Sequence, residues 1–337
     1  TDDAVPSIAI IPFRNKGKEK DSFYAFSISV DLISDCSSAG LIRVESLERI
    51  EKIKKYEKLD ITELASKLLV RYVTTGTLWK MDDIFQLSVE LYDTKNNKVV
   101  WSDRWEENWD NLASIKGNLS DGLLKALDIS SKVEKKVDSI NAEAYELYLK
   151  GKYNFEKRVS IDDINIAREF LQKAVDIDNT LLRAKNLLGW TYYSTGDYDE
   201  SMEISIDALE QAEKLGDKQG QGSSLMGIGS IFSVKYDDFD TALEYYNRSL
   251  KLREELDDKT GIARTLNSLG IIYKRKGEYD KALEYYSSSL KIREEINDKW
   301  GIANSFSNIG NIYSEKCEFN KAGEYHRRSL TIREEIG

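Results

Sequence analysis

The chain has 337 residues, a length that allows two domains with sizeable cores. Its formal net charge is −10, with acidic and basic residues interspersed, which argues against DNA or RNA binding because nucleic acids require a basic face. The two cysteines, Cys36 and Cys317, are too few for a disulfide framework or a zinc site, and no run of about 18 apolar residues predicts a membrane span.

The first part of the chain, 1–137, is predicted to form a small α/β domain. The run SIAIIPF at 7–13 is short and apolar and is suited to a buried strand. Further along, alternating polar and apolar residues with a turn at Asn96 and Asn97 predict a meander of strands. In chain order we expect a strand at 7–13, a helix at 23–39, a strand at 41–44, helices at 47–58 and 62–69, strands at 71–82, 83–93 and 98–107, and a helix at 108–127.

Four segments of this part resemble one family when they are taken in order. They are SIAIIPFRN, YAFSISVDLISDCS, LLVRYVTTGTL and VELYDTKNNKVVWSDRWEE. They resemble the small α/β domain of the TolB amino-terminal type, whose motifs are structural, so the resemblance implies a fold and no catalytic residue. In bacteria such a domain lies between a signalling output module, such as a nucleotide cyclase, a protein kinase or a winged-helix regulator, and a tetratricopeptide array. A charged segment at 130–139 is expected to link the two parts.

The second part, 138–337, is predicted to be an all-α solenoid of helical hairpins. Three stretches, 217–257, 258–297 and 298–337, are copies of one another with a 40-residue period, and such a period is typical of stacked hairpins. Divergent copies at 142–178 and 181–216 bring the expected number of hairpins to five. The predicted fold class is therefore α+β, a small α/β domain followed by an all-α repeat solenoid.

Two positions recur in every well-formed copy. A shared glycine is expected where the two helices of a hairpin approach closely, and it recurs as Gly189, Gly229, Gly270 and Gly310. A short oxygen-bearing side chain near the start of the second helix is predicted to be its N-cap, and it recurs as Asp199, Asp240, Asp280 and Asn320.

The pattern of small, aromatic and leucine positions over 142–337 resembles the tetratricopeptide repeat, in the 40-residue variety of kinesin light chains and of polarity adaptors of the LGN type. The resemblance implies that the first helix of each hairpin lines a groove, at positions six and three before the shared glycine and one, four and five after it. The groove residues read in this way are Arg183, Asn186, Trp190, Tyr193, Ser223, Ser233, Arg264, Asn267, Lys274, Arg275, Asn304, Ser307, Asn311 and Ser314.

These groove residues would suit an extended, acidic peptide. An asparagine can satisfy the donor and the acceptor of a peptide backbone together. Arg264, Lys274 and Arg275 offer charge-assisted hydrogen bonds to carboxylates. The alternative, a solvated face without a ligand, stays open because charged residues of helices commonly form such faces.

No catalytic residue, cofactor site or metal site is expected. His326, the one histidine, has no cysteine, serine or acid at a catalytic spacing. The glycine-rich segment 220–229 lacks the strand and the Lys-Ser or Lys-Thr pair of a phosphate loop. Trp101, Trp105 and Trp109 recur every four residues, as a helical stripe would, but a strand with the first two on one face explains them as packing residues.

The predicted function is that of a non-catalytic region of a bacterial signalling protein, regulatory or scaffolding, which binds a protein or an extended acidic peptide in its groove. The alternative is the regulatory part of a larger enzyme, a class III adenylate or guanylate cyclase or a protein kinase, whose catalytic domain lies outside this chain. A third alternative is self-association through the last hairpin, because its apolar face would otherwise meet water.

The chain opens on TDDAVPSIAII without an initiator methionine and stops directly after a repeat, so we expect a fragment of a longer protein. Its partners are expected to be proteins or peptides, without nucleic acid and without membrane insertion of this segment. Two cysteines that look reduced favour the cytoplasm, and the periplasmic face of the inner membrane, behind a helix outside this chain, is the alternative.

Overall fold

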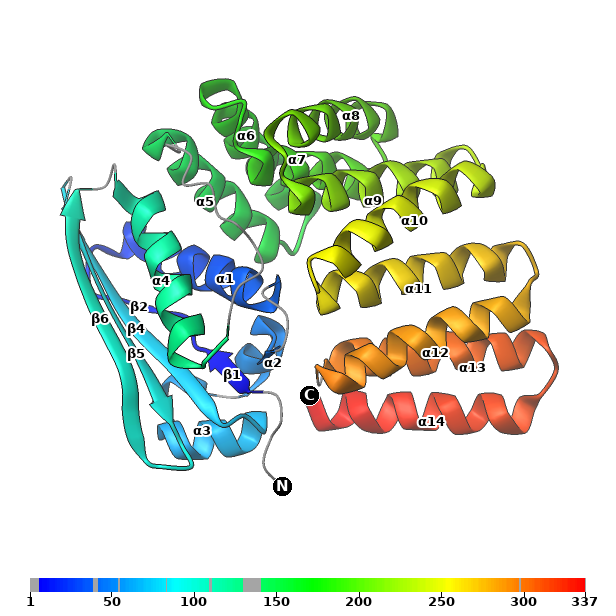
Figure 1. Ribbon diagram of the computed structural model, residues 1–337, viewed down its shortest axis with the longest axis horizontal. Helices are drawn as coiled ribbons and strands as arrows, with labels where there is room; N and C mark the ends of the chain where they lie inside the picture. Colours follow the sequence, from blue (N-terminus) through cyan, green and yellow to red (C-terminus); the bar gives the residue numbers. More distant parts are fainter. Residues whose placement is uncertain are drawn as a thin grey trace.

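The computed structural model describes residues 6–38, 42–53, 55–82, 84–108, 111–129, 141–296 and 298–336. Within these ranges, a domain that contains strands precedes an array of paired helices, which confirms the predicted fold class (Figure 1). The predicted linker 130–139 and Trp109 lie outside the described residues.

The α/β domain is built on a mixed sheet in the order β3-β1-β4-β5-β6, with β2 beside β4. β1 is parallel to β3 and β4, whereas β4, β5 and β6 form an antiparallel meander. Side chains of β5 are buried at the two-residue period of a strand with one face on a core. The strands are β1 Ser7–Ile10, β2 Arg14–Asn15, β3 Arg43–Val44, β4 Tyr72–Met81, β5 Ile84–Asp93 and β6 Lys98–Asn108.

Helices cover both faces of this sheet. α1 and α4 pack with β5 in one core, and α2 and α3 pack on the other face against β1 and β4. Trp101 and Trp105 of β6 pack against the first core, so their interpretation as packing residues of a strand is confirmed. The helices are α1 Ser22–Ser38, α2 Leu47–Lys52, α3 Ile61–Leu68 and α4 Leu112–Ala126, with short 3-10 turns at Glu19–Asp21 and Tyr56–Lys58.

Two predicted helix boundaries were wrong. The helix expected at 47–58 ends at Lys52, because the chain turns there and brings Ile53 and Tyr56 onto the second core. The helix expected from residue 108 begins at Leu112, because β6 stays paired with β5 as far as Asn108.

The array consists of antiparallel helical hairpins that follow an arc beside the α/β domain (Figure 1). Each pairs a first helix with a second helix, and neighbouring hairpins stack. In chain order the helices are α5 Ala142–Glu156, α6 Ile161–Ile177, α7 Leu182–Thr195, α8 Tyr198–Leu215, α9 Lys218–Lys235, α10 Phe239–Glu255, α11 Lys259–Arg275, α12 Tyr279–Glu295, α13 Lys299–Glu315 and α14 Phe319–Ile336.

The shared glycine lets the two helices of a hairpin approach closely. A Cβ atom on Gly270 would lie 2.6 Å from the ring of Tyr286, and one on Gly229 would lie 2.9 Å from the ring of Tyr246. Real Cβ atoms do not come so close to another heavy atom, so a larger residue here would push the helices apart. Glycine is therefore required at these positions by packing.

The predicted N-caps of the second helices were wrong. Asp199 and Asp240 lie inside the first turn of α8 and α10, and the capping position belongs to Asp197 and Asp238. The carboxylates inside the turn instead bind a lysine at the end of the next hairpin's first helix, where both helix dipoles favour these charges. The pairs are Lys235 with Asp199, Lys276 with Asp240 and Lys316 with Asp280. They fix the register of neighbouring hairpins.

Candidate interaction surface of the helical array

The inner face of the array is formed by the first helices of the hairpins, and part of it is covered by the α/β domain. α5, α7, α9 and α11 lie side by side, and α1 contacts both α5 and α11. In Figure 1, α1 lies inside the arc between these two helices. The core around α1 and α4 continues without interruption into α5, α6 and α7. The α/β domain and the first two hairpins therefore share one apolar core.

A buried carboxylate lies at the centre of this interface. Asp31 of α1 has no exposed surface, and it accepts hydrogen bonds from the hydroxyls of Tyr145 (2.8 Å) and Tyr148 (2.9 Å) and from the ammonium of Lys152. Burial opposes the charge on Lys152, but Asp31 outweighs it and raises the pKa of this lysine. Burial, followed by the charge of Asp31, raises the pKa of both tyrosines, so they stay neutral donors.

Arg183 is the predicted groove residue that takes part in this interface. Its guanidinium donates to the carboxylate of Asp35 (2.6 Å) and lies 3.7 Å from that of Asp31. The two acids are four residues apart on α1, so they lie on one face of the helix. Two carboxylates of α1 thus meet two cations of the inner face, Lys152 and Arg183.

The sequence did not single out Asp31 or Lys152. A signal was present in the sequence YAFSISVDL of α1, where Asp31 is the one charged residue among apolar and small polar ones, and the structure buries all nine side chains. A helix that lacks a solvated face is covered on more than one side. The sheet covers one side of α1, and the array covers the other.

Several other predicted groove residues are used as links within the array. Asn186 accepts from Ser224 (2.8 Å), and Asn267 accepts from Asn308 (2.9 Å), so each amide bridges two neighbouring first helices. Within the last hairpin, Asn304 and Ser307 of α13 bond to Arg333 and Ser329 of α14. Arg275 donates to the carbonyl of Ser233 in α9 and to the carboxylate of Asp237. The charge of Arg275 is therefore neutralised inside the array.

Trp190 and Tyr193 form an aromatic pair on α7. Their ring centroids are 5.1 Å apart in an edge-to-face arrangement. Together with Asn186 and Ser223 they line a narrow cleft of about 10 Å³ between α7 and α9, enough for about one water molecule. Burial, with smaller effects of nearby tyrosines, raises the pKa of Tyr193 to about 12. The structure thus brings together four predicted groove residues.

Arg264, Lys274 and Asn311 are predicted groove residues that retain exposed surface. Within the described ranges, Arg264 makes no ion pair, and it lies near two other arginines. Burial lowers the pKa of Arg253 and Arg293, the carboxylates of Asp258 and Asp298 oppose this effect, and the like charge of Arg264 adds a smaller lowering. An anion beside Arg264 would relieve this repulsion.

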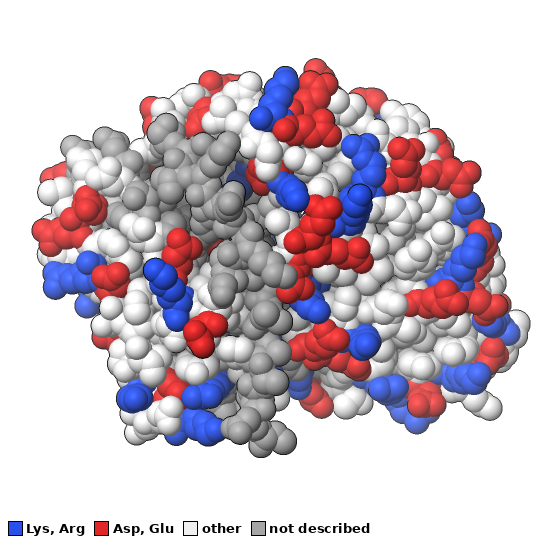
Figure 2. Space-filling model, in the orientation of Figure 1, with Lys and Arg blue, Asp and Glu red and all other residues white. Residues whose placement is uncertain are grey.

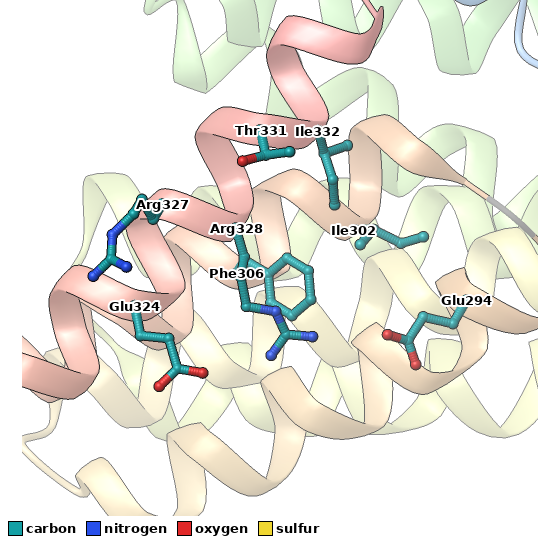
Figure 3. A pocket seen from close by; sticks show the side chains of 8 residues that line it. All are labelled: Glu294, Ile302, Phe306, Glu324, Arg327, Arg328, Thr331 and Ile332. Atoms are coloured by element: carbon teal, nitrogen blue, oxygen red, sulfur yellow. The ribbon is translucent and has the colours of Figure 1, made fainter.

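A second hollow lies in the last two hairpins, away from the predicted groove. It has a volume of about 520 Å³ and is bounded by α12, α13 and α14. In Figure 3 the Arg328 guanidinium lies beside the Phe306 ring, while Arg327 points away from it, and Glu294 and Glu324 flank the opening. Arg328 lies 4.1 Å from the ring centroid, so it covers an aromatic surface that would otherwise meet water.

Charges of both signs alternate over the face drawn in Figure 2. Within the described ranges, no group of three or more His, Cys, Asp or Glu side chains is arranged to hold a metal ion. In the same part of the chain, no helix combines the length and the apolar character that a membrane span needs.

Comparison with protein families identifies the hairpins. Residues 180–255 and 261–335 match the family model of the tetratricopeptide repeat. The hairpins in these two stretches are of the tetratricopeptide type. The α/β domain is similar to another family, since residues 3–121 match the model described as the second domain of HilA/YgeH-like transcriptional regulators. The resemblance to TolB amino-terminal domains stays a prediction. A comparison with curated proteins found no match.

Solved structures resemble part of this chain. The crystal structure of BtubC (BKLC) from P. vanneervenii is 20% identical with a TM-score of 0.50, and the match covers 67% of this chain and 89% of that chain. Two further similar structures are MamA (22% identity, TM-score 0.40, 55% and 94% of the chains) and a Rap protein complexed with competence and sporulation factor (15%, 0.45, 68% and 74%). At this identity, the likeness to BtubC shows the fold alone.

Proposed function

We propose that this chain is a non-catalytic regulatory module whose tetratricopeptide array binds a protein segment on its inner face. The observation that supports this proposal is α1, a helix of the same chain that already lies there with Asp31 and Asp35 against Lys152 and Arg183. An inner face that holds two carboxylates of its own chain has the chemistry to hold those of a partner. In this proposal the module itself catalyses no reaction.

The partner's segment is an extended, acidic peptide on the part of the inner face beyond α1. Arg264 and Lys274 supply positive charge there, and the Trp190–Tyr193 pair supplies an aromatic surface. Arg264 is exposed and makes no ion pair within the described residues, so its charge can bind an anion at this point. Arg275 takes no part, because its guanidinium is held by Asp237.

The larger context that we favour is a transcriptional regulator. The match of residues 3–121 to a domain of HilA/YgeH-like regulators supports this choice. In such a protein the module would sense a partner and pass the signal to a DNA-binding part outside this chain. The regulatory part of a class III adenylate or guanylate cyclase or of a protein kinase is the alternative context, which follows from the TolB-like resemblance alone.

The binding proposal is tested with fluorescein-labelled decapeptides of serine and alanine that carry zero, two or four glutamates. We expect fluorescence anisotropy to rise with the number of glutamates, and the affinity to fall about 10-fold or more in the variant Arg264→Ser/Lys274→Ser, because two charge-assisted contacts are lost. Serine occupies the corresponding positions of the preceding hairpin as Ser223 and Ser233, so the exchange suits the repeat.

The matched control is the variant Lys291→Thr/Arg327→Ser, which removes two cations from second helices. The new residues again occur at the equivalent positions of other hairpins. It has the same net charge as the groove variant. Equal loss of affinity in both variants would assign the binding to net charge and would refute a specific inner-face site. Failure of the peptides to bind the unaltered protein would refute it too.

A further inference from the structure

An aromatic side chain of the last hairpin contacts the α/β domain. Trp300 lies in the first turn of α13, and the ammonium of Lys52, at the end of α2, lies 5.2 Å from its ring centroid. Arg333 of α14 also approaches this ring, at 4.7 Å. Trp300 remains 40% exposed, so the contact lies at the surface of the molecule.

The tryptophan is specific to this hairpin. Gln219 and Thr260 occupy the equivalent position at the start of α9 and α11. Because these hairpins fold with a polar residue there, the repeat does not need an aromatic ring for its own packing. The side chain that departs from the repeat also contacts the other domain.

The two ends of the array are joined to the α/β domain with unequal strength. At α5 and α7 the contact is a shared apolar core with the buried Asp31 at its centre. At α13 it is an exposed cation–π contact, of a kind that is weak when it is open to solvent. The far end is therefore the one that can separate.

The middle of the array is suited to such a movement. α9 carries Gly222 and Gly227 where the later first helices have Ala263 and Ser268. Each glycine inside a helix weakens it by about 1 kcal/mol relative to alanine. α9 lies between the hairpins that share a core with α1 and the hairpins with cores of their own.

We propose that Trp300 and Lys52 form a latch. When this contact breaks and α11 leaves α1, the last two hairpins swing away from the α/β domain about α9, and the inner face between α1 and α11 opens. The movement itself does not depend on the proposed function. The role of the latch in admitting a partner does rest on it.

The test measures a distance across the latch in the full chain. Spin labels are placed on Cys317, which is exposed, and on Ser66→Cys in α3, while Cys36 is buried and stays unlabelled. Pulsed electron–electron double resonance then gives the distribution of distances between the two labels. We expect Trp300→Thr and Lys52→Gln each to raise the ratio of long to short distances by about 2–5-fold, the value of one exposed cation–π contact.

The control is Lys281→Gln, which removes a cation–π contact of the same 5.2 Å length over Tyr273 inside the array. It should leave the distribution unchanged. The proposal would be overturned if both latch variants gave the distance distribution of the unaltered protein. It would also be overturned if the control variant changed the distribution as much as they do. If Trp300→Thr disturbs the packing of its own hairpin, the result for Lys52→Gln decides between the outcomes, because Lys52 lies outside the array. This test uses no ligand. Its outcome is therefore independent of the peptide titration, and either one can fail while the other succeeds.

Discussion

At the scale of single residues, Asp31 joins two parts of the chain that are far apart in sequence. A buried carboxylate is stable only when donors and opposite charges replace the water it has lost. Two tyrosine hydroxyls and Lys152 do so here, and all three belong to α5. The requirement is mutual, because Lys152 is also buried and needs a counter-charge.

The substitution Asp31→Asn tests this interdependence. It keeps an acceptor for the tyrosines but leaves Lys152 buried without a negative partner at contact distance, so we expect the free energy of unfolding to fall by about 3–5 kcal/mol. Urea denaturation followed by circular dichroism measures the change. The double variant Asp31→Asn/Lys152→Met should lose much less, because no lone charge remains and the tyrosine hydroxyls keep an acceptor. A loss below about 1 kcal/mol in Asp31→Asn would contradict the assignment.

At the scale of the hairpin, much of the array could be predicted because each copy repeats the same contacts. The 40-residue period located the helices, and Gly270 recurs because the ring of Tyr286 leaves no room for a Cβ. The N-caps were misplaced because aspartate is favoured both at the cap and inside the first turn of a helix. The sequence alone does not distinguish Asp238 from Asp240, since only the packing shows that Asp240 binds the next hairpin.

Two glycines of the array give opposite predictions for the same exchange. Gly270→Ala would place a Cβ 2.6 Å from the Tyr286 ring, so we expect a loss of about 1–3 kcal/mol. Gly323→Ala in α14 meets no atom within 4 Å, so alanine should stabilise the helix by about 0.5–1 kcal/mol. Thermal unfolding of both variants measures the difference. The same sign for both would show that close packing is not what selects the glycine at position 270.

At the scale of the whole molecule, the docking of α1 against the inner face could not be predicted. The contact joins residue 31 to residues 145–183, and no local pattern encodes such a distant pairing. The resemblance to tetratricopeptide repeats placed Arg183 in a groove, but it did not show that the same chain supplies the carboxylates there. Asn186 and Asn267 each accept a hydrogen bond from a neighbouring first helix, a link that the repeat pattern did not show.

The unequal joining of the two ends predicts a gradient of local stability. α5 and α7 share the core of the α/β domain, whereas α13 and α14 depend on their own small core and expose Leu330 and Phe319. Local opening is easiest where apolar contacts are fewest. Hydrogen exchange followed by mass spectrometry should therefore show the slowest amide exchange in α5 and α7 and the fastest in α14. Uniform protection along the array would contradict the gradient.

The position of α1 on the inner face has a further consequence for any rival acidic segment. Because α1 belongs to the same chain, it meets Arg183 at an effective concentration of the millimolar order that is typical of short tethers. A free peptide at micromolar concentration would have to bind Arg183 about a thousandfold more tightly than α1 does in order to displace it. The Arg183 end of the surface is thus shielded from the many weak acidic segments of a cell, and selectivity there is set by the tether as much as by shape.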